Sequence, residues 1–431
     1  MPPEFGKRMH STANRRQVLR AGGIATAAGL AGCFGGGGGK GGNEIKLGCS
    51  ISLSGQFANA GKNIRKGQDF MVEQINSQGG IDVGGSKRKL KIKYYDDKSQ
   101  PSTSASRTQQ LITQDQTDLI LGPVTSSVTY ATLPIVKNQG AVMVQGYGIA
   151  TKIFEEYGSD GYTFCTIVSA GDTPVSSLKA FTNPDVTDPP IESIAMFSDK
   201  GTYPQSLRKA ITGPLADKFG YDVRVDENVE GGVKDLSPVI NKAKKSDADL
   251  FIMNTHAATG QLATNQMSSL KYSPKAVWAS FGGFTTTDYH DALGKRSRYQ
   301  TGFAQYSPNW EYDDPFFGSN QKFASAYKKK FGSDPAFTQA DGANIVETMA
   351  LAIEQAGSTD VEKVRSALGS LDAETLFGPV KFDGKGRIQK STGLLQRQGA
   401  DGSDITIVAP EKLKVNADAK LAYPMPAWSD R

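Results

Sequence analysis

From residue 44 onward, short apolar runs alternate with longer amphipathic stretches, and this alternation occurs in two successive series. Strands separated by helical segments are typical of βαβ units, whose strands pair in parallel within one sheet. The expected strands of the first series are 45–49, 90–94, 119–121 and 141–144, and those of the second are 194–197, 221–225, 250–253 and 276–278. The pattern therefore predicts an α/β chain with two doubly wound parallel-sheet lobes.

The segments between these strands have apolar residues at helical spacing, and 203–219 is predicted as one continuous helix. The C-terminal third is less regular, with helices expected over 316–331, 340–356 and 361–368. After Phe377, closely spaced glycines predict hairpins of short strands rather than further βαβ units.

The N-terminal segment has the features of an export address. The pair Arg15-Arg16 precedes a weakly apolar stretch that is too short to span a membrane, which takes about 20 residues. Leu30-Ala31-Gly32-Cys33 then resembles a bacterial lipobox. We expect a twin-arginine lipoprotein signal over 1–32, lipidation of Cys33 and a flexible glycine-rich linker over 33–43. These features predict an extracytoplasmic protein anchored to the cell membrane by lipid, whereas the alternative is a disordered tail with a chance cysteine.

The charge of the chain argues against a nucleic-acid partner. The 431 residues include 49 Lys and Arg against 44 Asp and Glu, a formal net charge of +5. Residues 1–32 contain five of the bases and one of the acids, so the remainder has a net charge of +1. A nearly neutral chain lacks the clustered basic face expected of a nucleic-acid-binding protein.

Two loops that follow expected strands are rich in hydroxyl groups and lead into helices. They are 52–61, after the first strand, and 122–127, after the strand that ends at Leu121. In open parallel sheets, ligands bind at the carboxyl ends of the strands. Helix N-termini there offer free N–H groups and a positive dipole end, which suit a carboxylate. An ordinary N-cap is the alternative for either loop alone, and the occurrence of both favours a binding site.

Several motifs in this order and spacing resemble the leucine/isoleucine/valine-binding protein family, the branched-chain amino-acid group of type I periplasmic binding proteins. The matching segments are 54–61, Gly67, 73–81, 95–97 with Pro101, 122–127, 199–203 and 377–386. The resemblance implies two lobes joined by a three-strand hinge, with crossings near 164–167, 305–308 and 377–380. Lobe one would comprise 44–166 and 307–377, and lobe two 167–306 and 378–431. A small organic solute would be held between the lobes, which close on it.

The same resemblance implies a set of ligand-binding residues. From lobe one these are Ser54, Gln56, Phe57, Thr125, Ser126, Ser127, Gly146 and Tyr147, whose hydroxyls and backbone N–H groups would hold a carboxylate. From lobe two they are Tyr203, Thr255, His256 and Phe281. An aromatic set would suit such a pocket, whereas packing in a core is favoured for at least half of its members, which are Phe57, Tyr147, Tyr203, Phe281 and Trp310.

Phe281 stands where amino-acid binders of this family place an acid that pairs with the ligand's ammonium group. A buried ammonium without a carboxylate is costly, so the sequence favours an aromatic or aliphatic acid, an amide or a quaternary ammonium over a standard branched-chain amino acid. Asp199, Asp288 and Asp341 are candidate substitutes, although surface or capping roles are favoured for each.

An enzyme is disfavoured because no catalytic constellation is recognisable. His10 lies in the expected signal, and neither His256 nor His290 has metal-type spacing to Cys, Asp or Glu. Cys49 and Cys165 are expected to be two separate buried thiols. The sequence predicts no cofactor and no metal, and a monomer that delivers its solute to an ABC permease. A ligand-sensing module that reports to a membrane receptor is the alternative.

Overall fold

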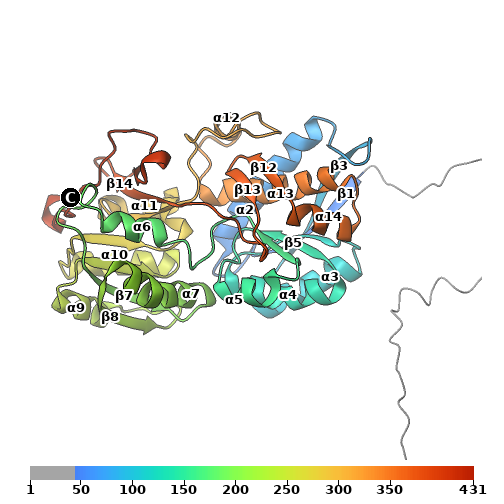
Figure 1. Cartoon of the computed structure of the whole chain (residues 1–431). Coiled ribbons are helices and arrows are strands. Elements are labelled where there is room, and N and C mark those ends of the chain that lie inside the picture. The colour runs from blue at the N-terminus through green and yellow to red at the C-terminus, as the bar shows by residue number, and fades with distance from the viewer. Residues whose placement is uncertain (1–43) are drawn as a thin grey trace, which may run out of the picture. The chain divides into compact units, whose positions relative to one another are not determined.

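The computed structural model of the chain describes residues 44–431 (Figure 1). The predicted signal (1–32), the lipidation site Cys33 and the linker (33–43) lie outside the described residues. Within the described part, two sheets form the centres of two lobes, which confirms the predicted α/β class. No helix of that part is long and apolar enough to cross a membrane.

Lobe one is built on a six-stranded sheet in the order β2-β3-β1-β4-β5-β6. Its strands are β1 (Glu44–Ile51), β2 (Ile81–Asp82), β3 (Lys87–Asp96), β4 (Leu119–Leu121), β5 (Val142–Gln145) and β6 (Thr163–Cys165). Strands β4 and β5 are buried along their whole length, as their continuous apolar sequences predict. Only β2 pairs antiparallel, with β3 at the edge.

Helices cover both faces of this sheet (Figure 1). On one side α3 and α4 pack against each other, and on the other α13 packs against α2 and α14. The helices of this lobe are α2 (Ala58–Ser77), α3 (Pro101–Thr113), α4 (Ser126–Gln139), α5 (Thr151–Ile153), α12 (Asn320–Phe331), α13 (Phe337–Ala356) and α14 (Val361–Gly369). A two-stranded sheet of β12 (Asp372–Thr375) and β13 (Gly378–Lys381) follows α14.

Lobe two is built on a seven-stranded sheet in the order β15-β14-β11-β10-β9-β7-β8. Its strands are β7 (Ser193–Asp199), β8 (Asp222–Val229), β9 (Leu250–Asn254), β10 (Ala276–Ala279), β11 (Thr301–Ala304), β14 (Gly393–Gln398) and β15 (Asp404–Ala409). The pairings of β14 with β11 and with β15 are antiparallel. The sheet is therefore mixed rather than wholly parallel, because the C-terminal hairpin adds to its edge.

The helices of lobe two differ from the sequence prediction over 203–219. They are α6 (Val175–Phe181), α7 (Thr202–Ala210), α8 (Ala216–Phe219), α9 (Ser237–Ser246), α10 (Ala257–Ser269) and α11 (Thr287–Leu293). The single helix predicted over 203–219 is interrupted by a π-helical turn, Ile211–Leu215, between α7 and α8. Pro214 lacks a backbone N–H, and Gly213 adopts non-helical angles (φ −121°, ψ −110°), so regular α-helical bonding cannot continue there.

The packing of the cores places the third crossing further along the chain than the sequence predicted. Val380, Phe382 and Ile388 belong to the core of lobe one, and the ring of Phe382 lies 5.2 Å from that of Phe164. The core of lobe two resumes only at Leu394. The predicted boundary at 377/378 is therefore wrong, because the β12–β13 hairpin and the residues up to Ile388 pack on lobe one.

Candidate functional site between the lobes

The loop after β1 is fastened to the loop after its neighbour β3. Asp96 accepts hydrogen bonds from the backbone N–H groups of Leu53 (2.9 Å) and Ser54 (3.2 Å) and from the Ser54 hydroxyl (2.7 Å). Burial acts to raise the pKa of Asp96, but the hydrogen bonds from Ser54, Lys98 and Leu53 outweigh it, so the pKa is lowered. The hydroxyl proton of Ser54 is thus committed to Asp96, while Gln56 is exposed.

The loop after β4 has two hydroxyls with different roles. Ser126 is fully buried, and its Oγ accepts from the N–H groups of Ile149 (3.0 Å) and Ala150 (3.1 Å). It therefore joins this loop to the loop after β5, and the structure assigns it a structural role rather than the predicted ligand contact. Ser127 is half-buried, and its hydroxyl lies 3.2 Å from that of Thr125. No side chain caps α4, which leaves its first-turn N–H groups for another acceptor.

Gly146 and Tyr147, after β5, adjoin a buried acid. A Cβ at Gly146 would lie 1.9 Å from Oδ2 of Asp341, so only glycine fits there. The Tyr147 ring meets Phe337 edge-on at 6.1 Å, and its pKa is raised, chiefly by burial and also by Asp341. Asp341 is fully buried, contrary to the surface or capping role favoured from sequence, and accepts from the Thr166 hydroxyl (3.1 Å).

On lobe two, the ends of β7 and β9 bring Asp199, Thr255 and His256 together. Oδ2 of Asp199 accepts from the Thr255 hydroxyl at 2.5 Å and lies 3.3 Å from Nδ1 of His256. Asp199 is only 4% exposed, so the surface or capping role favoured from sequence is wrong here too. Its other oxygen, Oδ1, is buried and has no hydrogen-bond partner among the described residues. A buried carboxylate oxygen without a hydrogen-bond partner is energetically costly unless a bound ligand supplies a donor.

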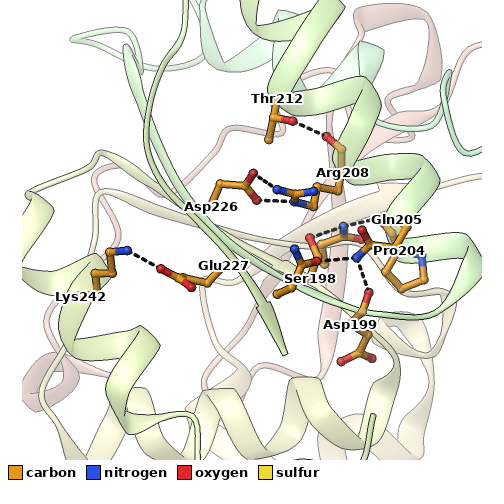
Figure 2. A network of polar contacts seen from close by, with 11 residues as sticks. Ser198, Asp199, Pro204, Gln205, Arg208, Thr212, Asp226, Glu227 and Lys242 are labelled. Atoms are coloured by element: carbon orange, nitrogen blue, oxygen red, sulfur yellow. Dashed lines mark hydrogen bonds and ion pairs between the residues drawn. The ribbon is translucent and has the colours of Figure 1, made fainter. Parts of the chain in front are cut away.

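A polar network supports this end of β7. Gln205 donates to the backbone carbonyl of Asp199 (2.8 Å) and to Asn228 (2.7 Å). Asn254 donates to the Ser198 hydroxyl (2.8 Å) and thereby joins β9 to β7. Figure 2 shows the Asp199 carboxylate pointing away from this network. The network therefore fixes the backbone of Asp199 and leaves its carboxylate available.

Three aromatic side chains meet where the two lobes face each other. The His256 ring, on lobe two, lies 5.5 Å from that of Phe57 on lobe one and 6.2 Å from that of Tyr203. Tyr203 packs against the cores of both lobes, and its hydroxyl donates to the carbonyl of Ser280. The structure thus brings three of the predicted residues together, although Phe57 and His256 are nearly 200 positions apart in the chain.

Two polar contacts also bridge the lobes. The amide of Asn59, at the start of α2, donates to the carboxylate of Asp288 on α11. The backbone N–H of Thr151 donates to the Ser206 hydroxyl on α7 (3.2 Å). Sequence reasoning overlooked Asn59 and Ser206, because nothing in the sequence shows which residues of one lobe oppose which residues of the other.

Two predicted aromatic residues lie elsewhere. The Phe281 ring packs inside lobe two, 5.3 Å from Tyr289 and 6.2 Å from Phe284, against the backbone of α10 at Gly260. Trp310 donates from Nε1 to the carbonyl of Leu413 (2.9 Å) at the hinge. Neither belongs to the aromatic group around His256, so the aromatic set predicted from sequence is split by the fold.

Two further observations concern possible metal ligands and reactive thiols in residues 44–431. That part of the chain contains no group of three or more His, Cys, Asp or Glu placed to hold a metal ion. Cys49 and Cys165 are free and buried, as predicted. Burial is also the main cause of the raised pKa of both thiols, which makes them unreactive.

Comparisons with known proteins agree with this architecture. The family model described as periplasmic binding protein matches residues 44–402. The Leu/Ile/Val-binding protein homolog 7 of Brucella abortus is 24% identical over 383 residues, covering 84% of this chain and 91% of the relative. The leucine-, isoleucine-, valine-, threonine-, and alanine-binding protein of Pseudomonas aeruginosa is 26% identical over 350 residues, covering 80% and 87%.

Solved structures share the fold at lower identity. The substrate-binding protein LivJ of Streptococcus pneumoniae, in complex with isoleucine, has a TM-score of 0.72 at 18% identity, covering 84% of this chain and 97% of that protein. A solute-binding protein of R. palustris, in complex with benzoate, has a TM-score of 0.68 at 18% identity, covering 83% and 94%. The fold is that of a type I periplasmic binding protein.

Proposed function

This chain belongs to the periplasmic binding protein family, and we propose that it is the solute-binding protein of an ABC importer for an amino acid or a related carboxylate or amide. The family consists of solute-binding proteins rather than enzymes, and membership implies a location outside the cytoplasm. The observation that most supports the proposal is the meeting of Phe57 with His256 and Tyr203, because it joins strand-end loops of both lobes.

We place the acidic end of the solute at the start of α4. The uncapped first turn offers backbone N–H groups, and the hydroxyls of Thr125 and Ser127 stand beside it. N–H groups and the positive end of the helix dipole favour a carboxylate there.

We place a donor group of the solute, an ammonium or an amide, at Asp199. Its unpartnered Oδ1 supplies the acceptor that the sequence analysis found missing at Phe281. With Phe281 packed inside lobe two, its identity no longer argues against an amino acid. Rotation of the lobes about the hinge would then close Phe57 and His256 over the solute.

The N-terminal segment completes the proposal. Export through the twin-arginine pair Arg15-Arg16 and lipidation of Cys33 would anchor the protein, as a monomer, beside its permease. Cells that express the Cys33→Ser variant should release the protein in soluble form, and intact-mass measurement should find no lipid on it. Retention of the variant in the membrane fraction would contradict the anchor.

A thermal-shift experiment on the full chain with Cys33→Ser tests the solute class. Leucine is compared with 4-methylpentanoate, which lacks the ammonium group, and with leucinamide, which lacks the carboxylate. A ligand that binds only the folded state raises the melting temperature by mass action. We expect the largest rise from a compound with both groups, across this set and the matching alanine and phenylalanine sets.

Two matched variants test whether Asp199 is the residue that recognises the ammonium group. Asp199→Asn should abolish the difference between the amino acid and its ammonium-free analogue, whereas Asp185→Asn, an exposed acid of the same lobe, should preserve it. A rise with 4-methylpentanoate alone would contradict the assignment of Asp199. No rise with any compound of these sets would contradict the proposed solute class.

A further inference from the structure

A pocket of about 750 Å³ lies at the hinge, separate from the face that contains Phe57 and His256. Each of the three crossings contributes to its wall, through Val168, Trp310 and the segment 387–391. None of its lining residues comes from the loops after β1, β4, β5, β7 or β9. Its volume is within the range of ligand-binding cavities.

The charged groups that line this pocket are mostly basic. Arg387, Lys390 and Lys412 line it, against one acid, Asp172. Arg387 is paired with Asp383 at 2.8 Å and lies 3.9 Å from Asp172, so its charge is compensated. The excess positive charge of the pocket therefore resides on Lys390 and Lys412.

Lys390 is the more informative of the two because its side chain is half-buried and its ammonium is held by neutral groups. Its ammonium donates to the backbone carbonyls of Phe377 (3.1 Å) and Gln305 (3.4 Å), and no described carboxylate forms an ion pair with it. Burial lowers its pKa to about 8, an effect that Asp341 opposes from a greater distance. The same ammonium lies 4.8 Å from the centroid of the Phe377 ring. Carbonyl dipoles and a ring face do not neutralise a partly desolvated cation, and an anion in the pocket would do so.

Another part of the wall is apolar and aromatic, although Ser176, Gln389 and Ser391 also line the pocket. Trp310 and Tyr312 stand edge to face at 5.9 Å, and Leu413 is held against Trp310 by its carbonyl. A planar apolar group can pack against these side chains while an acidic group reaches Lys390. An inorganic anion would leave these apolar side chains uncovered.

We infer that the hinge pocket is a second binding site, which takes a small organic anion with an aromatic or aliphatic body. The carboxylate contacts Lys390 and Lys412, and the apolar body lies against Trp310, Tyr312 and Leu413. A molecule that fills the pocket also reaches Val168 and so touches all three crossings. It binds best at the hinge angle that fits it and favours that arrangement of the lobes. This site is independent of the solute that the interlobe face takes.

The test is calorimetric titration of the full chain, carrying Cys33→Ser, with 2-naphthoate as the probe. We expect one site at the hinge. Lys390→Gln keeps a donor for the two carbonyls but removes the charge, and should weaken binding about tenfold or more. Lys412→Gln, at the exposed rim and without risk to folding, should weaken it about threefold. Lys385→Gln, an exposed lysine outside the pocket, is the matched control and should bind as the parent does.

Three further measurements complete the design. The uncharged analogue 2-naphthamide should bind about tenfold more weakly than 2-naphthoate. His256→Ala should leave 2-naphthoate binding unchanged, because His256 belongs to the interlobe face. Trp310→Phe should abolish the quenching of tryptophan fluorescence by the probe, whereas Trp428→Phe should not.

Several outcomes would overturn the inference. These are an affinity weaker than about 1 mM, equal binding of the amide, or equal binding by the Lys390 and Lys412 variants. Loss of binding in His256→Ala alone would place the probe on the interlobe face instead. Because the probe and variants differ from those of the leucine experiment, failure of either proposal leaves the other standing.

Discussion

Phe57 and Phe281 are equivalent in the sequence analysis, but the structure predicts opposite consequences for their removal. Both follow an expected strand, and the sequence predicts both as ligand-binding residues. Phe281 is 4% exposed and enclosed by Phe284, Tyr289 and the backbone of α10. Phe57 is half-buried, and within residues 44–431 its one aromatic neighbour is His256 on the other lobe.

The expected magnitudes follow from this difference. Phe281→Ala leaves a cavity inside lobe two and should cost about 3–5 kcal/mol of unfolding free energy. Phe57→Ala removes roughly half of a buried side chain and should cost about 1–2 kcal/mol. With a urea dependence of about 3 kcal/mol per M, Phe281→Ala lowers the unfolding midpoint by about 1–1.7 M and Phe57→Ala by about 0.3–0.7 M.

The assay is urea unfolding followed by circular dichroism, together with the ligand-induced rise in melting temperature. Phe57→Ala should lose the rise and keep most of its stability, whereas Phe281→Ala should lose stability and keep the rise at temperatures where it is folded. The reasoning is refuted if Phe281→Ala unfolds at the same urea concentration as Phe57→Ala and no longer responds to ligand.

Three other predictions concern buried polar groups and close packing. Burial raises the folded-state pKa of Asp341 to about 7, although Thr166, Lys390 and Tyr147 act to lower it. Folding therefore takes up protons between about pH 4 and 7. As pH rises through that window, the free energy of unfolding falls by up to about 1.4 kcal/mol per pH unit. Asp341→Asn should remove that part of the slope in pH-dependent denaturation, and an unchanged slope would refute it. Gly146→Ala should lower the melting temperature by several degrees because its Cβ has no space, whereas Gly369→Ala, with open space around it, should not; equal melting temperatures would contradict this. Ser126→Ala strands two buried N–H donors and should cost about 1–3 kcal/mol, while Ser127→Ala should leave stability unchanged and reduce the response to ligand; the reverse pattern in melting and binding measurements would exchange their roles.

Asp199 could be predicted as a candidate residue from the sequence, but its environment could not. The sequence offers it as one of three substitute acids and favours a surface or capping role for it, because no local pattern indicates that it is buried. The structure places it behind Thr255 and His256, with one oxygen unpartnered. The burial of Asp199 and its contacts depend on the end of β9 lying beside the end of β7. These two strands pair although they are more than 50 residues apart in the chain.

The position of the third crossing between the lobes likewise could not be predicted from the sequence. Glycine spacing predicted hairpins after Phe377, and β12–β13 and β14–β15 are hairpins. The sequence could not show that the first hairpin packs on lobe one and the second completes the sheet of lobe two. That assignment depends on side chains such as Phe382 meeting Phe164, a contact between segments that are distant in the chain.

The α/β class and the two series of strands could be predicted from the sequence alone, and so could the loops that we propose as ligand-binding. These follow from local periodicity, since strand and helix patterns are set by neighbouring residues. Tertiary structure alone decided that Phe57, Tyr203 and His256 face one another, while Phe281 and Trp310 lie elsewhere. An aromatic side chain after a strand suits a core and a binding face equally well. Only the packing of neighbouring elements determines which of the two it occupies.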